Sequence, residues 1–126
     1  MEANIPTSPT SLTEGFLTNV LEKTPFGFAL MNGDYVVEFA NDTWLEIAHK
    51  TREEVTGKKL FDLFPETAEQ LIPLCETVRK TGNPFHAPEF SIKLVRNGVL
   101  QNVYFNFIYH PVYDDNGAFQ YFVTVA

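Results

Sequence analysis

Asn-Gly turn signals constrain the fold of this chain more than any other feature. Asn32-Gly33 and Asn97-Gly98 each separate two apolar segments that are rich in β-branched and aromatic residues. Because Asn and Gly adopt positive φ at low cost, such a pair favours the tight turn of an antiparallel hairpin. A third turn signal, Asp114-Asp115-Asn116-Gly117, precedes the last apolar segment. The segments that we expect to form strands are residues 26–31, 35–40, 90–95, 99–109 and 119–125.

The residues between the second and third predicted strands carry helix signals instead. Asn41 or Asp42 can cap a short helix, and Thr51-Arg52-Glu53-Glu54 has the spacing of a capping box. A longer helix is predicted over residues 66–80, with a kink or a late start caused by Pro73. Strands that flank a helical middle favour an α+β fold, here a five-stranded antiparallel sheet with helices on one face.

The N-terminal residues precede this pattern. Residues 1–10 are expected to be a disordered tail, and a capping box at Ser11-Leu12-Thr13-Glu14 begins an amphipathic helix over residues 11–23. This helix can fold back on the sheet of its own chain or pair with a second copy. We favour a homodimer, because an uncovered sheet face would be an exposed apolar patch. Residues 24–126 would then form one domain. The apolar stripe of the helix consists of Leu12, Phe16, Leu17, Val20 and Leu21.

Charge and composition argue against several partners. The chain has 16 acidic and nine basic residues, for a net charge of −7. The basic residues are scattered, so no face gathers enough of them to bind the phosphates of a nucleic acid. No apolar run approaches the roughly 20 residues of a spanning helix, so we expect no membrane insertion by this segment. Cys75 is the only cysteine, which excludes an internal disulfide and a multi-cysteine zinc site and indicates a reducing, cytoplasmic setting.

The order of these elements and the residues at their junctions resemble the PAS family. Residues 27–41, from Gly-Phe-Ala-Leu-Met to Tyr-Val-Val-Glu-Phe-Ala-Asn, look like the first hairpin of the family and the Asn that commonly starts its first short helix. Residues 57–65, Gly-Lys-Lys-Leu-Phe-Asp-Leu-Phe-Pro, are similar to a second stretch of the family. Residues 110–117, His-Pro-Val-Tyr-Asp-Asp-Asn-Gly, are similar to the turn before its last strand. The resemblance covers about residues 24–126.

The resemblance implies a sensory or dimerisation module that catalyses nothing itself. We expect it to belong to a cytoplasmic bacterial signalling protein, in the first place a sensor histidine kinase, with an output domain further along the same chain. A small ligand or a partner would shift the module between two packings. The alternative from another class is a small ligand-binding enzyme domain with a polar cavity. The sequence shows no catalytic motif and no set of metal ligands.

The resemblance also implies a pocket between sheet and helices, which either a ligand or the side chains of the protein can fill. Trp44, the only tryptophan, is expected near the pocket wall, where core packing is favoured over ligand stacking. Tyr104 and Asn106 would be polar handles if they faced inward, but the periodicity puts Phe105 and Phe107 on the more apolar face. The residues expected to line the pocket are Phe28, Leu30, Phe39, Trp44, Leu63, Leu74, Cys75, Val78, Phe90, Phe105 and Phe107.

Two cofactors of the family would lack their usual protein ligand. Haem is usually bound by a His of the long helix, but His49, His86 and His110 all lie outside that helix. The photoactive flavin subclass has a reactive Cys where this chain has Lys50-Thr51-Arg52-Glu53. Haem and covalent flavin are therefore disfavoured, while non-covalent flavin and the identity of any cofactor stay open. Cys75 is interpreted as a small buried hydrophobic residue.

Overall fold

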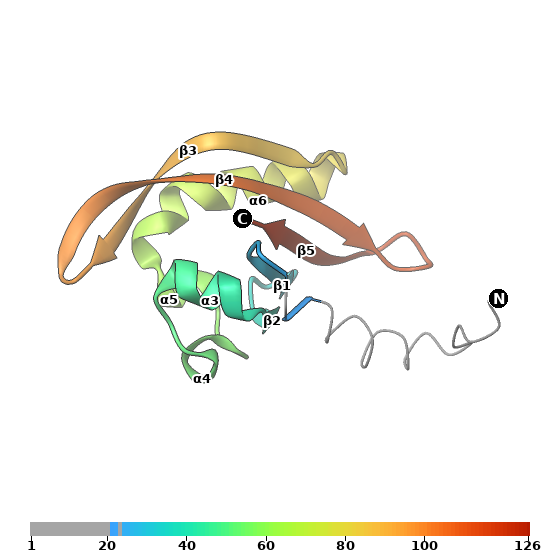
Figure 1. Cartoon of the computed structure of the whole chain (residues 1–126). Helices are drawn as coiled ribbons and strands as arrows, with labels where there is room; N and C mark the ends of the chain where they lie inside the picture. The colour runs from blue at the N-terminus through green and yellow to red at the C-terminus, as the bar shows by residue number, and fades with distance from the viewer. Residues whose placement is uncertain (1–20, 23) are drawn as a thin grey trace.

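The computed structural model describes residues 21–22 and 24–126. Within them, five strands form one sheet in the spatial order β2-β1-β5-β4-β3, and each pair of neighbours is antiparallel. The predicted number of strands and their antiparallel pairing are thus confirmed. The strands, labelled in Figure 1, are β1 (Phe28–Asn32), β2 (Val37–Ala40), β3 (Phe85–Arg96), β4 (Val99–Tyr113) and β5 (Phe119–Val125).

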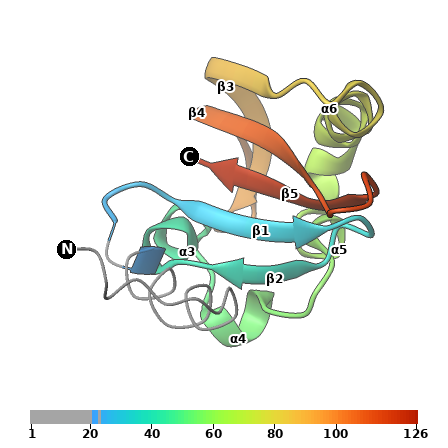
Figure 2. The same cartoon turned by 90° about the vertical axis from the view of Figure 1, so that its right-hand side faces the viewer.

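The helices follow β2 in the chain and gather on one face of the sheet (Figure 2), which confirms the predicted α+β class. Asn41 caps α3 with its side chain, Thr51 forms a complete capping box with Glu54 in α4, and Gly82 ends α6 with positive φ. Local signals therefore determine three helix ends. The helices are α3 (Asp42–Ala48), α4 (Arg52–Val55), α5 (Leu60–Leu63), the 3-10 turn η2 (Pro65–Thr67) and α6 (Ala68–Thr81).

Prolines account for the largest differences between the predicted and the observed boundaries. β3 begins at Phe85, earlier than predicted, and includes Pro88. A proline has no backbone N–H to donate. Because β3 is an edge strand, Pro88 can turn that side of its backbone away from β4, so no hydrogen bond of the sheet is lost. β4 continues past Pro111 instead of ending before it. α6 begins at Ala68, after the 3-10 turn, and runs through Pro73.

The turn between β1 and β2 is longer than predicted. The side-chain oxygen of Asn32 accepts hydrogen bonds from the backbone N–H groups of Asp34 and Val36, at 2.8 and 3.1 Å. Tyr35, and not Asn32, has a positive φ of 66°. The expectation that the second strand starts at residue 35 is therefore wrong. β2 begins at Val37, because the chain turns at residues 33–35 and Val36 forms only an isolated bridge with Lys59.

Alternation along β4 separates an inner from an outer face of the sheet. Phe107 and Tyr109 are buried, whereas Tyr104 is 66% exposed. A bulge in β3 lies opposite Asn106, whose side-chain oxygen accepts a hydrogen bond from the Glu89 N–H at 2.7 Å. Tyr104 and Asn106 therefore face outward, as the periodicity predicts, and are not handles inside a pocket.

Most of the predicted N-terminal features lie outside the described residues. These features are the tail over residues 1–10 and the stripe residues Leu12, Phe16, Leu17 and Val20. Leu21 is described, is half-buried, and its carbonyl accepts a hydrogen bond from the Asn41 side chain at 2.7 Å. Among the described helices, none combines the length and the apolar character that crossing a membrane requires.

Candidate functional site

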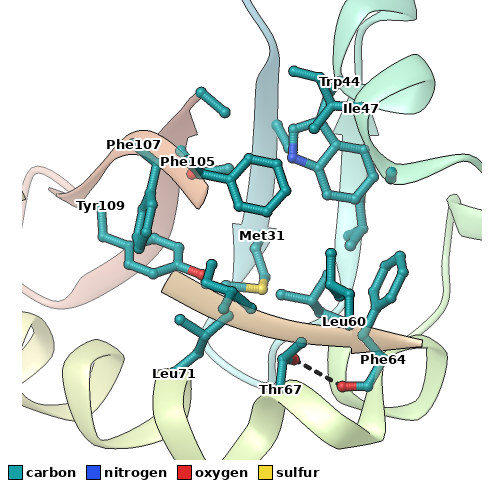
Figure 3. A pocket seen from close by; sticks show the side chains of 17 residues that line it. Met31, Trp44, Ile47, Leu60, Phe64, Thr67, Leu71, Phe105, Phe107 and Tyr109 are labelled. Carbon is teal, nitrogen blue, oxygen red and sulfur yellow. Dashed lines mark hydrogen bonds between the residues drawn. The ribbon is translucent and has the colours of Figure 1, made fainter. Parts of the chain in front are cut away.

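An apolar cavity lies between the inner face of the sheet and the helices. Its volume is about 110 Å³. Figure 3 shows side chains converging on it from several elements, with aromatic rings on two sides. The cavity is therefore built from residues that are far apart in the sequence.

The sheet contributes an aromatic wall. Phe105, Phe107 and Tyr109 are alternate residues of β4, so all three point to the inner face and line the cavity. The rings of Phe107 and Tyr109 meet edge to face, with their centroids 5.3 Å apart. Ala29 and Met31, the inward residues of β1, extend this wall with smaller or more flexible side chains. The wall presents ring faces and edges to whatever occupies the cavity.

Helix α3 forms the facing wall. Trp44, Ile47 and Ala48 lie on one side of this helix, at spacings of three and four residues, and line the cavity. Gly27 permits the close approach of α3, because a Cβ there would lie 3.1 Å from the Trp44 Cα and from the Ile47 Cδ1. Arg96 at the end of β3 donates a hydrogen bond to the Ile47 carbonyl at 2.6 Å. Contacts with Gly27 before β1 and with Arg96 at the end of β3 thus fix α3 against the sheet.

The third wall comes from α5, η2 and the first turns of α6. Leu60, Phe64, Thr67 and Leu71 line it. The Thr67 hydroxyl donates a hydrogen bond to the Phe64 carbonyl at 2.7 Å, the dashed line in Figure 3. This hydroxyl is buried and its proton is already used, so the wall behaves as an apolar surface.

None of the described residues that line the cavity has an acidic or basic side chain at neutral pH. The polar side-chain atoms of the lining belong to Thr67, Thr124, Tyr109 and the indole of Trp44. Burial raises the pKa of Tyr109 well above its ordinary value of 10, so its hydroxyl stays protonated. General acid–base catalysis requires a group that titrates near the working pH, and this lining offers none. The cavity is suited to binding rather than to proton transfer.

Cys75 lies in the core behind the cavity wall and does not line the cavity. Its side chain is completely buried, and burial raises the pKa of the thiol to about 12. The thiolate, which is the reactive form, is therefore suppressed at neutral pH. Cys75 packs as the small apolar residue that the sequence indicates.

Outside the cavity, a cluster of polar and aromatic side chains joins α6 to the β1–β2 turn. The Arg79 guanidinium lies over the rings of Tyr35 and Phe119 and donates a hydrogen bond to the Gly33 carbonyl at 2.8 Å. The Tyr35 hydroxyl donates to the Glu76 carboxylate. Burial, and then this hydrogen bond, raises the pKa of Tyr35 to about 12. In the sequence, only the spacing of Glu76 and Arg79 by three residues signals this cluster.

Three of the residues expected in the pocket line the observed cavity, namely Trp44, Phe105 and Phe107. Five others pack in or against the core without lining it: Cys75 and Val78 are buried, and Leu63, Leu74 and Phe90 are partly buried.

Phe28, Leu30 and Phe39 lie on the outer face of the sheet, opposite the cavity. The burial of β1 alternates so that Ala29 and Met31 face inward, and Leu30 pairs with Phe39 across the β1–β2 ladder. Both sets of β1 residues are apolar, so the alternation by itself did not show which set faces the core. From α5, η2 and α6 the sequence predicted other residues than those that line the cavity, because the choice depends on how these short elements pack together. The lining residues are Leu60, Thr67 and Leu71, and not Leu63, Leu74, Cys75 and Val78.

Comparisons with known proteins agree with this architecture. The PAS fold family matches residues 21–126. The PAS domain of Bordetella pertussis BvgS superposes with a TM-score of 0.64 at 18% identity, over 86% of this chain and 80% of that one. A sensory box sensor histidine kinase from Vibrio cholerae superposes with a TM-score of 0.65 at 19% identity, over 92% of this chain and 90% of that one.

A longer protein also contains this fold. An RNA-binding light-oxygen-voltage receptor superposes with a TM-score of 0.71 at 17% identity, and 99% of this chain covers 34% of that receptor. The chain thus spans about a third of the receptor's length. A comparison with curated proteins finds no match. The solved structures are too distant in sequence to show more than the fold, but the family match extends over most of the chain. This chain belongs to the PAS fold family and is a PAS sensory domain.

Proposed function

We propose that this PAS domain is the signal-sensing module of a cytoplasmic sensor histidine kinase and that it binds a small ligand in the cavity. The cavity itself carries the proposal, since about 110 Å³ of apolar space lies between the sheet and α3. Well-packed interiors contain few voids larger than a water molecule, so a space of this size supports a binding role. The likeness to the Vibrio cholerae sensor histidine kinase supports the kinase context.

The place of the cavity suggests how a ligand would affect the ends of the domain. Gly27 and Ala126 pair through two backbone hydrogen bonds, of 2.9 and 2.8 Å. Ala126 also lines the cavity, and Gly27 packs against Trp44. A ligand that displaces Trp44 would therefore press on the residues where the chain enters and leaves the domain. In this proposal an output domain further along the same chain responds to that displacement.

Homodimerisation is part of the same proposal. The outer face of the sheet carries half-exposed apolar side chains on β1, β2 and β5, and no described helix covers it (Figure 2). The apolar stripe that the sequence predicts over residues 12–21 would supply further apolar surface for the pairing. A two-fold pair of domains is the commonest way to bury such surfaces, and it would place two output domains side by side.

Native mass spectrometry of the purified protein tests the ligand site. We expect the wild type to release a bound small molecule and Ala48→Leu to lack it, because a larger side chain at this position fills the cavity. Ala118→Leu adds the same atoms in the exposed turn before β5 and is the matched control. Equal amounts of the same molecule in the wild type and in Ala48→Leu would show that the cavity is not the binding site.

A further inference from the structure

The lining of the cavity disfavours a charged ligand. None of the described residues that line it is acidic or basic. Two cations that contact lining residues are already engaged: Arg96 donates to the Ile47 carbonyl at 2.6 Å, and the Lys50 ammonium lies over the Phe64 ring at 5.4 Å. A charged ligand would lose its hydration in this space without gaining an opposite charge, which is strongly unfavourable. The occupant is therefore neutral.

The volume limits the occupant to about one ring. An engineered apolar cavity of about 150 Å³ binds benzene, whereas pockets for drug-sized molecules begin near ~300 Å³. A space of about 110 Å³ fits neither a haem nor a flavin. The rings of Phe105, Phe107 and Tyr109 form one wall, and aromatic rings pack favourably against such edges and faces. Size and surface together favour a single aromatic ring with one or two additional atoms.

The indole N–H of Trp44 is a hydrogen-bond donor on one wall of the cavity. Figure 3 shows this nitrogen directed across the cavity toward Phe105. Among the described residues, no acceptor pairs with it, and the nitrogen keeps some accessible surface, since the one buried side-chain nitrogen or oxygen without a partner there is Arg79 Nε. An N–H that faces an apolar space gains from a ligand atom that accepts its hydrogen bond. The Thr67 hydroxyl does not compete for that atom, because its proton is donated to the Phe64 carbonyl.

We propose that the cavity binds an uncharged, one-ring aromatic molecule with a single oxygen that accepts a hydrogen bond from the Trp44 indole N–H. This inference rests on the proposed function, since it takes the cavity as the ligand site. The aromatic wall of β4 holds the ring, and α3 supplies the one directional contact. Signal recognition and the displacement of α3 then involve the same residue.

Phenol, toluene and benzoate test the three parts of this proposal by calorimetric titration and by NMR. Phenol and toluene have the same size and differ in the oxygen, whereas benzoate adds a charge together with about two further heavy atoms, so its binding would contradict both the charge limit and the size limit. Because Trp44 is the only tryptophan, its indole N–H gives a single, assignable signal. We expect phenol and toluene to bind, benzoate not to bind, and phenol alone to move the indole proton signal downfield. Trp44→Phe should weaken phenol binding about two- to twelve-fold, the value of one net hydrogen bond, and toluene binding less than about twofold.

Variants with a larger side chain in the cavity test whether the probes bind there. Ala48→Leu and Ala126→Leu should each abolish binding of both probes, and Ala118→Leu should retain it. Benzoate binding that the filling variants abolish, or an equal loss of phenol and toluene binding in Trp44→Phe, would overturn the ligand class. If no probe binds but the filling variants remove a different molecule from the purified protein, the ligand class is wrong and the proposed function stands. If the filling variants change neither measurement, the proposed function fails as well.

Discussion

Asn41 connects the cavity to the segment that leads into the domain. Its side chain is fully buried. The oxygen accepts hydrogen bonds from the backbone N–H groups of Phe28 and Trp44, both at 2.9 Å. The amide nitrogen donates to the carbonyls of Leu21 and Phe26, at 2.7 and 3.0 Å. The cap on α3 was predictable from the sequence, but the other bonds depend on a chain reversal that no local signal encodes.

Substitutions at Asn41 separate these contacts. Asn41→Asp keeps both accepted bonds but turns a carboxylate oxygen toward two carbonyl groups, and Asn41→Ala loses every side-chain bond. We expect each variant to lower the free energy of unfolding by about 2–4 kcal/mol, because several buried polar groups lose their partners. Urea denaturation measures the effect, and Asn102→Ala on the exposed face of β4 should change it by less than about 0.5 kcal/mol. An Asn41→Asp protein as stable as the wild type would show that the donated bonds contribute nothing.

The Cys75 thiol makes stability depend on pH in the alkaline range. Burial raises its pKa from 9.0 to about 12. Since the folded pKa lies above the unfolded one, the stabilising contribution is complete below about pH 9 and is lost as the pH rises toward about 12. This residue alone should lower the free energy of unfolding by about 1.4 kcal/mol per pH unit in that range.

Cys75→Ala tests this contribution in urea denaturation between about pH 8 and about pH 11. The variant should be less stable at neutral pH because it leaves a small void, but its stability should fall less steeply above about pH 9. Tyr35 and Tyr109 titrate in both proteins, but Cys75 contributes to the raised pKa of each tyrosine, so the difference between the two slopes reports Cys75 together with its effect on these two residues. Equal slopes would mean that the thiol ionises as easily in the folded protein as in the unfolded chain.

At the scale of elements, β3 is an edge strand whose free backbone groups are covered by side chains. The Gln70 amide donates to the Ser91 carbonyl at 2.9 Å and accepts from the Lys93 N–H at 3.0 Å. The Glu66 carboxylate accepts from the Val95 N–H at 3.0 Å. A sixth strand would use these same groups, so the side chains of η2 and α6 protect the edge against pairing with another chain.

Each of these contacts should protect a particular amide from hydrogen exchange. Gln70→Ala should accelerate exchange at Lys93, and Glu66→Ala should accelerate exchange at Val95, because each amide loses its acceptor. A net hydrogen bond of about 1 kcal/mol corresponds to about fivefold faster exchange by local opening. Glu69→Ala, on the exposed side of α6, should leave both rates unchanged. Equal acceleration of both amides by either variant would point to a general loss of stability instead.

Hairpin signals predicted the strands because hairpins are local structures. Asn97 and Gly98 both have positive φ, of 55° and 76°, as an Asn-Gly turn requires. The turn between β1 and β2 was not predictable in the same way. Its positive φ falls on Tyr35, whose ring stacks on Phe122 with a centroid distance of 5.7 Å. Because Phe122 is distant from Tyr35 in the sequence, the residues around Tyr35 do not indicate this contact.

The cavity was predictable only where one face of an element is clearly the more apolar. Along β4, Phe105 and Phe107 alternate with the outward-facing Tyr104 and Asn106, and both phenylalanines line the cavity. Along β1, Phe28 is much larger than Ala29, and Leu30 and Met31 are of similar size, yet Ala29 and Met31 face inward. Small inward residues leave space that larger residues would fill. A prediction that picks the largest apolar side chains as pocket residues therefore misses the small residues that line a cavity.

At the scale of the whole molecule, the outward-facing β1 residues form an apolar outer face. Leu30 pairs with Phe39 of β2 and with Val123 of β5, and Phe28 pairs with Val125. All five side chains are half-exposed, and the described helices cover the opposite face. A contiguous apolar patch of this kind is typical of an interaction surface, and it supports the proposed homodimer.

Leu30→Lys separates dimerisation from ligand binding. In a dimer the new charge would have to leave water at the centre of the interface, whereas in a monomer it stays hydrated, so the variant favours the monomer. We expect light scattering to give about twice the 14.3 kDa chain mass for the wild type and the single-chain mass for Leu30→Lys. Val95→Lys, at the exposed tip of the β3–β4 hairpin, should remain dimeric. Because Leu30 points away from the cavity, the affinity of Leu30→Lys for toluene should stay within about twofold of the wild type. A wild-type mass of one chain would contradict the dimer, and an unchanged mass for Leu30→Lys would move the interface away from this face.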